Sequence, residues 1–196
     1  MPRPVAISEP MRGALLECFR AATRLKTEDV DVAAPSAALI DIWKGVSDGA
    51  LNFSIESDGK IAFDAPQGFR VRLNIIEIGS GCIHRIHVTE PFHEGSVASM
   101  SDLLLMRAVT VVDRGGDGDR LDFQWLLEGV FQKLEQFPRI DDEELHWLAK
   151  AAEAVYGPIG YLGIASCIAT TNEAAALALL HKGKKSSQVH VAKRQS

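Results

Sequence analysis

Apolar residues recur at helical spacing near the start of the chain. Residues 10–26 and 36–45 carry apolar positions three and four apart, which predicts two amphipathic helices. Ser8 and Ser36 stand where such helices begin, and serine favours that position. Asp48-Gly49 then breaks the pattern. We therefore expect two helices before the first change of period.

From Ala50 the period changes to two, which is typical of strands with one apolar face. Asp58-Gly59 is a hairpin turn signal within this region. The pattern predicts four strands, at 51–56, 61–63, 69–75 and 83–88.

The second half returns to helical spacing and predicts helices at 101–112, 119–134, 142–155 and 172–181. On the second of these, Phe131 and Leu134 belong to the stripe expected to face inward. The fold class predicted is α+β, a small mixed sheet flanked by helices with a C-terminal helical segment. We expect an α/β core at 1–114, a helical segment packed on it at 115–182 and a flexible basic tail at 183–196.

Composition and charge exclude several classes of protein. The 196 residues are 46% hydrophobic and 24% charged, which is ordinary for a globular protein. A net charge of −5 argues against general nucleic-acid binding, which depends on neutralising phosphates. Apolar runs are too short for a membrane span, and the first residues lack the apolar region of a signal peptide, so we expect a cytoplasmic protein that does not enter membranes.

The cysteines and histidines do not form a metal-site pattern. Cys18, Cys82 and Cys167 lie far apart, which argues against a disulfide framework. The run from Cys82 to His87, with His93 nearby, has no evident fourth ligand, and structural zinc sites want four. We therefore predict no metal and no cofactor.

One segment in the second half resembles a known family. Ser101 to Ala108, followed by Arg114 and then by the run from Asp119 to Phe123, resembles the pattern D-L-L-x-x-K-x-x-A … R … D-x-x-D of minimal nucleotidyltransferase-fold proteins, in particular their uncharacterised fungal-type branch. Arg107 matches the basic position, and Asp119 and Asp122 match the paired acids. The resemblance covers roughly residues 29–134 and implies a nucleotidyltransferase-like fold.

The part of the family pattern that carries the chemistry is missing. In the family that this chain resembles, active members place Gly-Gly or Gly-Ser at a helix start and three acids on neighbouring strands. The acids are required because two Mg²⁺ ions need anionic oxygen ligands. Here Pro35-Ser36 stands at the helix start. Asn52 and Ser54 stand at the first two acidic positions, and Asn74 stands at the third. The resemblance therefore implies that two-metal nucleotidyl transfer is lost.

A vacated site of this kind would suit a largely apolar small molecule oriented by a few polar contacts. It could catalyse a metal-free intramolecular cyclisation in specialised metabolism, for example a pericyclic [4+2] reaction, by holding one reactive conformer. No catalytic residue is assigned. The residues expected to bind the substrate are Ser36, Asn52, Ser54, Arg70, Arg72, Asn74 and Arg107.

Other interpretations stay open. The chain could be a non-catalytic interaction protein, or an active Mg²⁺-dependent enzyme that uses displaced acids such as Asp48, Glu56 or Glu77. Asn52, Ser54 and Asn74 could be solvated sheet residues, and Arg70 and Arg72 surface charges. Arg107 could be a structural ion-pair residue that binds Asp119 or Asp122. The sequence fixes neither the substrate nor the oligomeric state.

Overall fold

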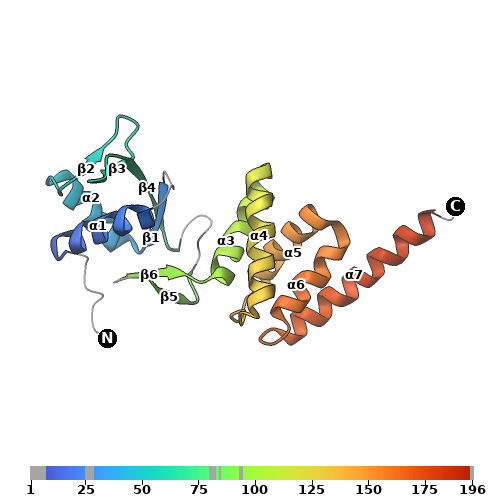
Figure 1. Ribbon diagram of the computed structural model, residues 1–196. Helices are drawn as coiled ribbons and strands as arrows, with labels where there is room; N and C mark the ends of the chain where they lie inside the picture. Colours follow the sequence, from blue (N-terminus) through green and yellow to red (C-terminus); the bar gives the residue numbers. More distant parts are fainter. Residues whose placement is uncertain (1–7, 25–28, 80–82, 84, 93–94, 195–196) are drawn as a thin grey trace. The chain divides into compact units, whose positions relative to one another are not determined.

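The chain has an α+β fold that divides into two compact units. The computed structural model describes residues 8–24, 29–79, 83, 85–92 and 95–194 (Figure 1). The first unit comprises Met1–Arg85 with His93–Gly95, and the second comprises Ile86–Phe92 with Ser96–Ser196. Each unit has its own cluster of buried apolar side chains.

The first unit combines two helices with a four-stranded mixed sheet (Figure 1). Its elements are α1 (Pro10–Arg24), β1 (Asp29–Ala34), α2 (Ser36–Ser47), β2 (Phe53–Ile55), β3 (Ile61–Asp64) and β4 (Arg70–Glu77). The strand order is β1-β4-β3-β2, with β1 parallel to β4 and the other neighbours antiparallel. β1 was not predicted, because its pairing partner lies some forty residues further along the chain.

The sheet has one apolar and one polar face, as period-two patterning requires. Phe63, Val71 and Leu73 point to the apolar face and are buried in the core with residues of α1 and α2. The alternate positions, among them Arg70, Arg72 and Asp64, are exposed. The polar face is therefore where a site on this sheet would lie.

Helix α1 has an unusual backbone. Its φ angles are positive from Met11 to Ala22, between 37° and 54°. A left-handed helix of L-residues costs roughly 1–2 kcal/mol per residue, because each Cβ crowds the following carbonyl oxygen.

The second unit is mainly helical (Figure 1). It holds β5 (Thr89–Phe92) and most of β6 (Gly95–Ala98), which form a two-stranded sheet, and then α3 (Met100–Asp113), α4 (Asp117–Lys133), α5 (Asp142–Tyr156), the 3₁₀ turn η1 (Gly157–Ile159), α6 (Gly160–Ile168) and α7 (Glu173–Arg194). None of the helices in the described part of the chain is long and apolar enough to cross a membrane.

The division between the units differs from the predicted boundary at residue 114. Helix α3 packs against α4 and α5 and belongs to the helical unit, because its buried apolar side chains, Leu104, Leu105, Ala108 and Val111, are part of that core. Leu103 of the same helix is 41% exposed and lies outside that core.

Two further elements were missed in the second half. The Gly-rich segment 160–168 is helix α6, and Gly160 lies so close to the Ala152 backbone that a Cβ could not be accommodated there without a shift. The segment expected as a tail from 183 continues α7 to Arg194.

Candidate functional site

The polar face of the four-stranded sheet brings together most of the predicted binding residues of the first unit. Ser54 of β2 and Arg72 of β4 flank Ala62 of β3, and Asp29 of β1 lies beyond Arg72 in the same row. The alternation of apolar and polar residues along each strand places these side chains on one face of the sheet. They form a row across the strands because the three strand pairings are in register.

Arg70 and Arg72 are both bound by acids of the same face. Arg70 Nε lies 2.7 Å from Asp64 Oδ1, and its Nη1 lies 3.3 Å from Glu56 Oε1. Arg72 Nε lies 3.2 Å from Glu56 Oε2. The hydrogen bond from Arg70 lowers the pKa of Asp64 below its ordinary value, so this carboxyl stays ionised at neutral pH. Both guanidinium groups are thus neutralised within the chain.

Asn74 also binds an acid of the same sheet face. Its Nδ2 donates a hydrogen bond of 2.9 Å to Asp31 Oδ1, which comes from the directly paired position on β1. This bond uses one of the two N–H donors of the Asn74 amide and fixes the orientation of the side chain.

Ser36 lies at the first position of α2 and donates a hydrogen bond to the Glu77 carboxylate at the end of β4. The start of a helix carries a partial positive charge and favours an anion. In a nucleotidyltransferase-like fold, a phosphate group would be expected at this helix start. Here Glu77 supplies the anion.

Asn52 does not lie on the strand that was predicted to carry it. β2 begins at Phe53, and Asn52 precedes it with φ 66°, a left-handed conformation that Asn tolerates better than most residues. Its carbonyl oxygen accepts the Asp64 N–H at 2.8 Å. Asn52 therefore lies in the turn before β2, whereas Ser54 lies on the strand.

Arg107 belongs to the helical unit and forms ion pairs there. Its Nη1 lies 2.9 Å from Asp119 Oδ1, and its Nη2 lies 3.2 Å from Asp122 Oδ2. Arg114 also contacts Asp119, at 3.0 Å. The ion pairs of Arg107 and Arg114 with Asp119 and Asp122 therefore link α3 to α4. They agree with the alternative interpretation of Arg107 as a structural ion-pair residue.

Sequence reasoning missed the main buried polar cluster, which surrounds Asp102. This side chain is 1% exposed and accepts hydrogen bonds from the backbone N–H groups of His87 and Val88 and from the Ser99 hydroxyl, at 2.8–2.9 Å. The described part of the predicted strand 83–88 is therefore not a strand, since these N–H groups bind a carboxylate. The Ser99-x-x-Asp102 spacing at the start of α3 was the available signal.

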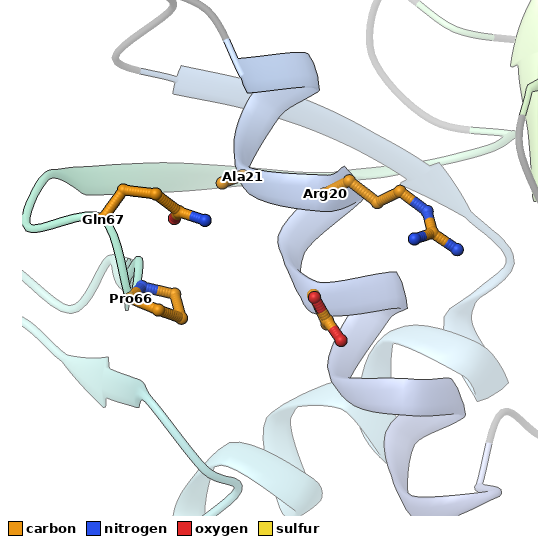
Figure 2. Close-up of a pocket in the computed structure, with 5 residues that line it drawn as sticks. Arg20, Ala21, Pro66 and Gln67 are labelled. Carbon is orange, nitrogen blue, oxygen red and sulfur yellow. The ribbon is translucent and has the colours of Figure 1, made fainter.

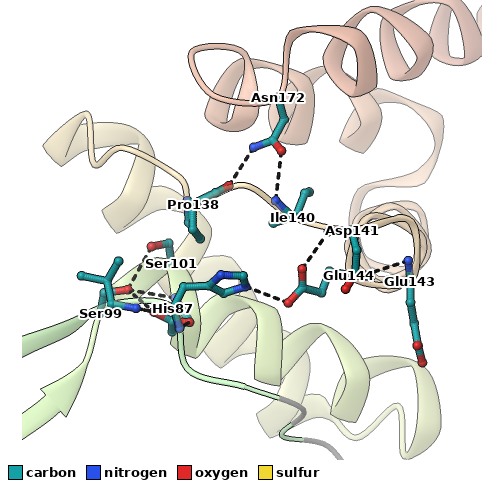
Figure 3. Close-up of polar contacts among 11 residues, drawn as sticks. His87, Ser99, Ser101, Pro138, Ile140, Asp141, Glu143, Glu144 and Asn172 are labelled. Atoms are coloured by element: carbon teal, nitrogen blue, oxygen red, sulfur yellow. Dashed lines mark hydrogen bonds and ion pairs between the residues drawn. The ribbon is translucent and has the colours of Figure 1, made fainter. Parts of the chain in front are cut away.

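His87 also contacts helix α5. Its Nε2 lies 2.8 Å from Glu144 Oε1, and both side chains are largely buried (Figure 3). Glu144 Oε2 in turn accepts the Asp141 N–H as part of the α5 capping box. His87 therefore anchors the chain to α5, and it lines neither of the hollows described below.

The described residues offer neither a reactive cysteine thiol nor a cluster of metal ligands. Burial raises the pKa of the Cys18 thiol to about 12 and that of Cys167 to about 11, so both are un-ionised and unreactive at neutral pH. No group of three His, Cys, Asp or Glu side chains within the described residues is placed to hold a metal ion. Cys82, His84 and His93 lie outside the described residues.

Two of the hollows that described residues line border α1. One lies beside the turn after β3 and is lined by Arg20, Ala21, Pro66 and Gln67 together with Glu17 (Figure 2). The other lies between the starts of α1 and β2, along α2. None of the seven predicted binding residues lines either hollow.

Comparisons with known proteins add no assignment, since no family model, no curated protein and no solved structure matches this chain.

Proposed function

We propose that this chain is a nucleotidyltransferase-like protein that acts by binding another protein and does not carry out metal-dependent nucleotide transfer. The observation that carries the proposal is the internal pairing of the polar sheet face, where Arg70 and Arg72 are held by Glu56 and Asp64.

The charge of this face disfavours a nucleoside triphosphate. The acids placed there by the strand register and by ion pairs, Asp29, Asp31, Glu56 and Asp64, outnumber the two arginines that they surround, Arg70 and Arg72. A triphosphate would have to displace carboxylates that already bind both guanidinium groups. The carboxylates of the face also repel the negatively charged phosphates wherever no cation screens the two.

The exposed apolar side chains of the helical unit support a protein partner. On α4, Leu121 is 64% exposed, Trp125 is 67% exposed and Phe131 is 57% exposed. Large aromatic side chains outside the core are typical of protein-binding surfaces, where their burial supplies most of the affinity.

The small-molecule cyclase stays a prediction. Such an enzyme needs an apolar enclosure next to Asn74. The described residues beside Asn74 belong to the polar face of the sheet, where Asp31 binds its amide. Stabilisation of the protein by members of a panel of apolar metabolites in a thermal-shift assay would favour it.

The proposal is tested by thermal-shift titration and a transfer assay with Mg²⁺ and each nucleoside triphosphate. We expect neither a shift nor transfer for the wild type, because a ligand raises the midpoint only when it binds the native state. Glu56→Gln should gain a triphosphate-dependent shift, since it removes the carboxylate shared by Arg70 and Arg72.

Asp58→Asn is the matched control for Glu56→Gln. It removes an exposed carboxylate that pairs only with Lys60 among the contacts described, and it should gain no shift. Magnesium-dependent transfer by the wild-type protein would contradict the proposal.

A further inference from the structure

Strand β1 forms one edge of the four-stranded sheet. Among the described elements it pairs with β4 alone, so its other edge carries backbone groups without a strand partner. The carbonyl oxygen of Ala34 accepts the Ile78 N–H at 3.0 Å and therefore points towards β4. Backbone groups of successive strand residues point to opposite edges, so those of Asp31 and Ala33 point to the open edge. This edge can receive the hydrogen bonds of another extended chain.

The side chains of β1 form an acidic row and an apolar row. Asp29 and Asp31 lie on the polar face of the sheet and are exposed. Val30 and Val32 lie on the opposite face, where they are half-buried and pack against the core of the first unit. A strand added to the open edge would therefore place its side chains alternately beside carboxylates and beside valines.

Strand β4 shows which chemistry suits these side chains, because it lies against them from the other side. It places Arg72 opposite Asp29 and Asn74 opposite Asp31. The Asn74 amide donates a hydrogen bond to Asp31 but is neutral, so it leaves the charge of this carboxylate uncompensated. A basic residue on the open side of Asp31 would supply the opposite charge.

We propose that the open edge of β1 binds an extended segment of a partner protein in which basic and apolar residues alternate. The inference rests on the proposed protein-binding function and names the kind of segment that is bound. Main-chain hydrogen bonds to Asp31 and Ala33 supply affinity, and the alternating side chains supply specificity. A basic side chain pairs with Asp31, while apolar side chains cover Val30 and Val32.

A second copy of β1 fits this edge poorly. Residues opposite each other on neighbouring strands point to the same face of a sheet. Antiparallel pairing of two β1 strands would therefore gather Asp29 and Asp31 of both copies on one face, where like charges repel. The acids thus discriminate between occupants by repelling strands of their own sign.

Binding of a short peptide to the full-length chain tests the proposal. The probe is a fluorescently labelled peptide of six residues, the length of β1, in which lysine and valine alternate. Fluorescence anisotropy should show a dissociation constant on the order of 100 μM, since a few main-chain hydrogen bonds and an exposed ion pair give modest affinity. A peptide with glutamate in place of lysine should bind about tenfold more weakly or less, because the acids of β1 repel it.

Charge reversal on the protein tests the place of binding. Asp31→Lys should weaken binding of the lysine–valine peptide about tenfold, because an attraction becomes a repulsion. Asp58→Lys is the matched control, since it changes the net charge equally but lies between β2 and β3, at the other edge of the sheet. It should change the dissociation constant by less than about twofold. Equal weakening by both variants would overturn the assignment to β1.

Main-chain bonding is tested by changing the peptide alone, so that the fold of the protein is not at risk. One version is N-methylated at its lysines and another at its valines, and each loses the N–H groups along one edge. Only one edge of the peptide faces β1, so one version should lose binding about tenfold or more and the other should keep it. Equal effects of the two versions would overturn strand addition.

The outcomes separate this inference from the proposed function. A lysine–valine peptide that does not bind up to on the order of 1 mM overturns the strand addition, while the nucleotide assays still decide the proposed function. Magnesium-dependent nucleotide transfer overturns the proposed function whether or not the peptide binds.

Discussion

At the scale of single residues, Asp102 makes the most consequential polar contacts of the helical unit. Its carboxylate receives two backbone N–H groups and one hydroxyl while almost no part of it reaches solvent. A buried carboxylate is tolerated only when its oxygens are satisfied in this way. It therefore fixes the chain at His87 and Val88 against the start of α3.

Replacing this acid tests that role. Asp102→Asn should lower the free energy of unfolding by about 2–3 kcal/mol, because the amide NH₂ cannot accept the backbone hydrogen bonds that a charged carboxylate accepts. Urea denaturation measures the change. Asp113→Asn, an exposed acid at the other end of α3, should change stability by less than about 0.5 kcal/mol. Equal effects of the two substitutions would contradict the anchoring role.

At the scale of elements, local sequence signals decide where some helices begin. Asp141 precedes α5 and accepts hydrogen bonds from the N–H groups of Glu143 and Glu144, while the Glu144 side chain binds the Asp141 N–H (Figure 3). This reciprocal arrangement satisfies N–H groups that a helix start otherwise leaves unpaired. The Asp141-x-x-Glu144 spacing is therefore a local sequence signal for the start of α5.

The cap has a measurable contribution. Asp141→Ala should lower stability by about 1 kcal/mol, since the first turn of α5 loses its side-chain acceptor. Asp142→Ala removes a neighbouring acid that makes no described capping bond, so its effect should be smaller. Thermal unfolding of both variants measures the difference, and a larger loss for Asp142→Ala would contradict the capping geometry.

At the scale of the whole molecule, the chain carries two separate cores. The buried cluster of the first unit draws on α1, α2, β3 and β4, and that of the second on α3 to α7. Helix α3 contributes to the second cluster alone, although it follows the strands in sequence. A core complete within one segment allows that segment to fold by itself.

A fragment that begins at Ile86 should therefore fold alone. We expect helical circular dichroism and a cooperative thermal transition, because all residues of its buried cluster lie between Leu104 and Leu179. A fragment that starts at Gly115, the predicted boundary, lacks α3 and should unfold without cooperativity. Similar melting of the two fragments would place the boundary where the sequence predicted it.

Periodicity alone determined the α+β class, the strands at 61–63 and 69–75 and most of the helices, because each depends on residues close together in the chain. Tertiary structure decided the rest. β1 depends on pairing with distant β4, and His87 and Val88 leave the strand pattern because Asp102 binds their N–H groups. Phe131 and Leu134 were expected to face inward, but Phe131 is exposed on α4 and Leu134 is exposed directly after it, since a spacing of apolar residues does not say which of two faces the core will cover.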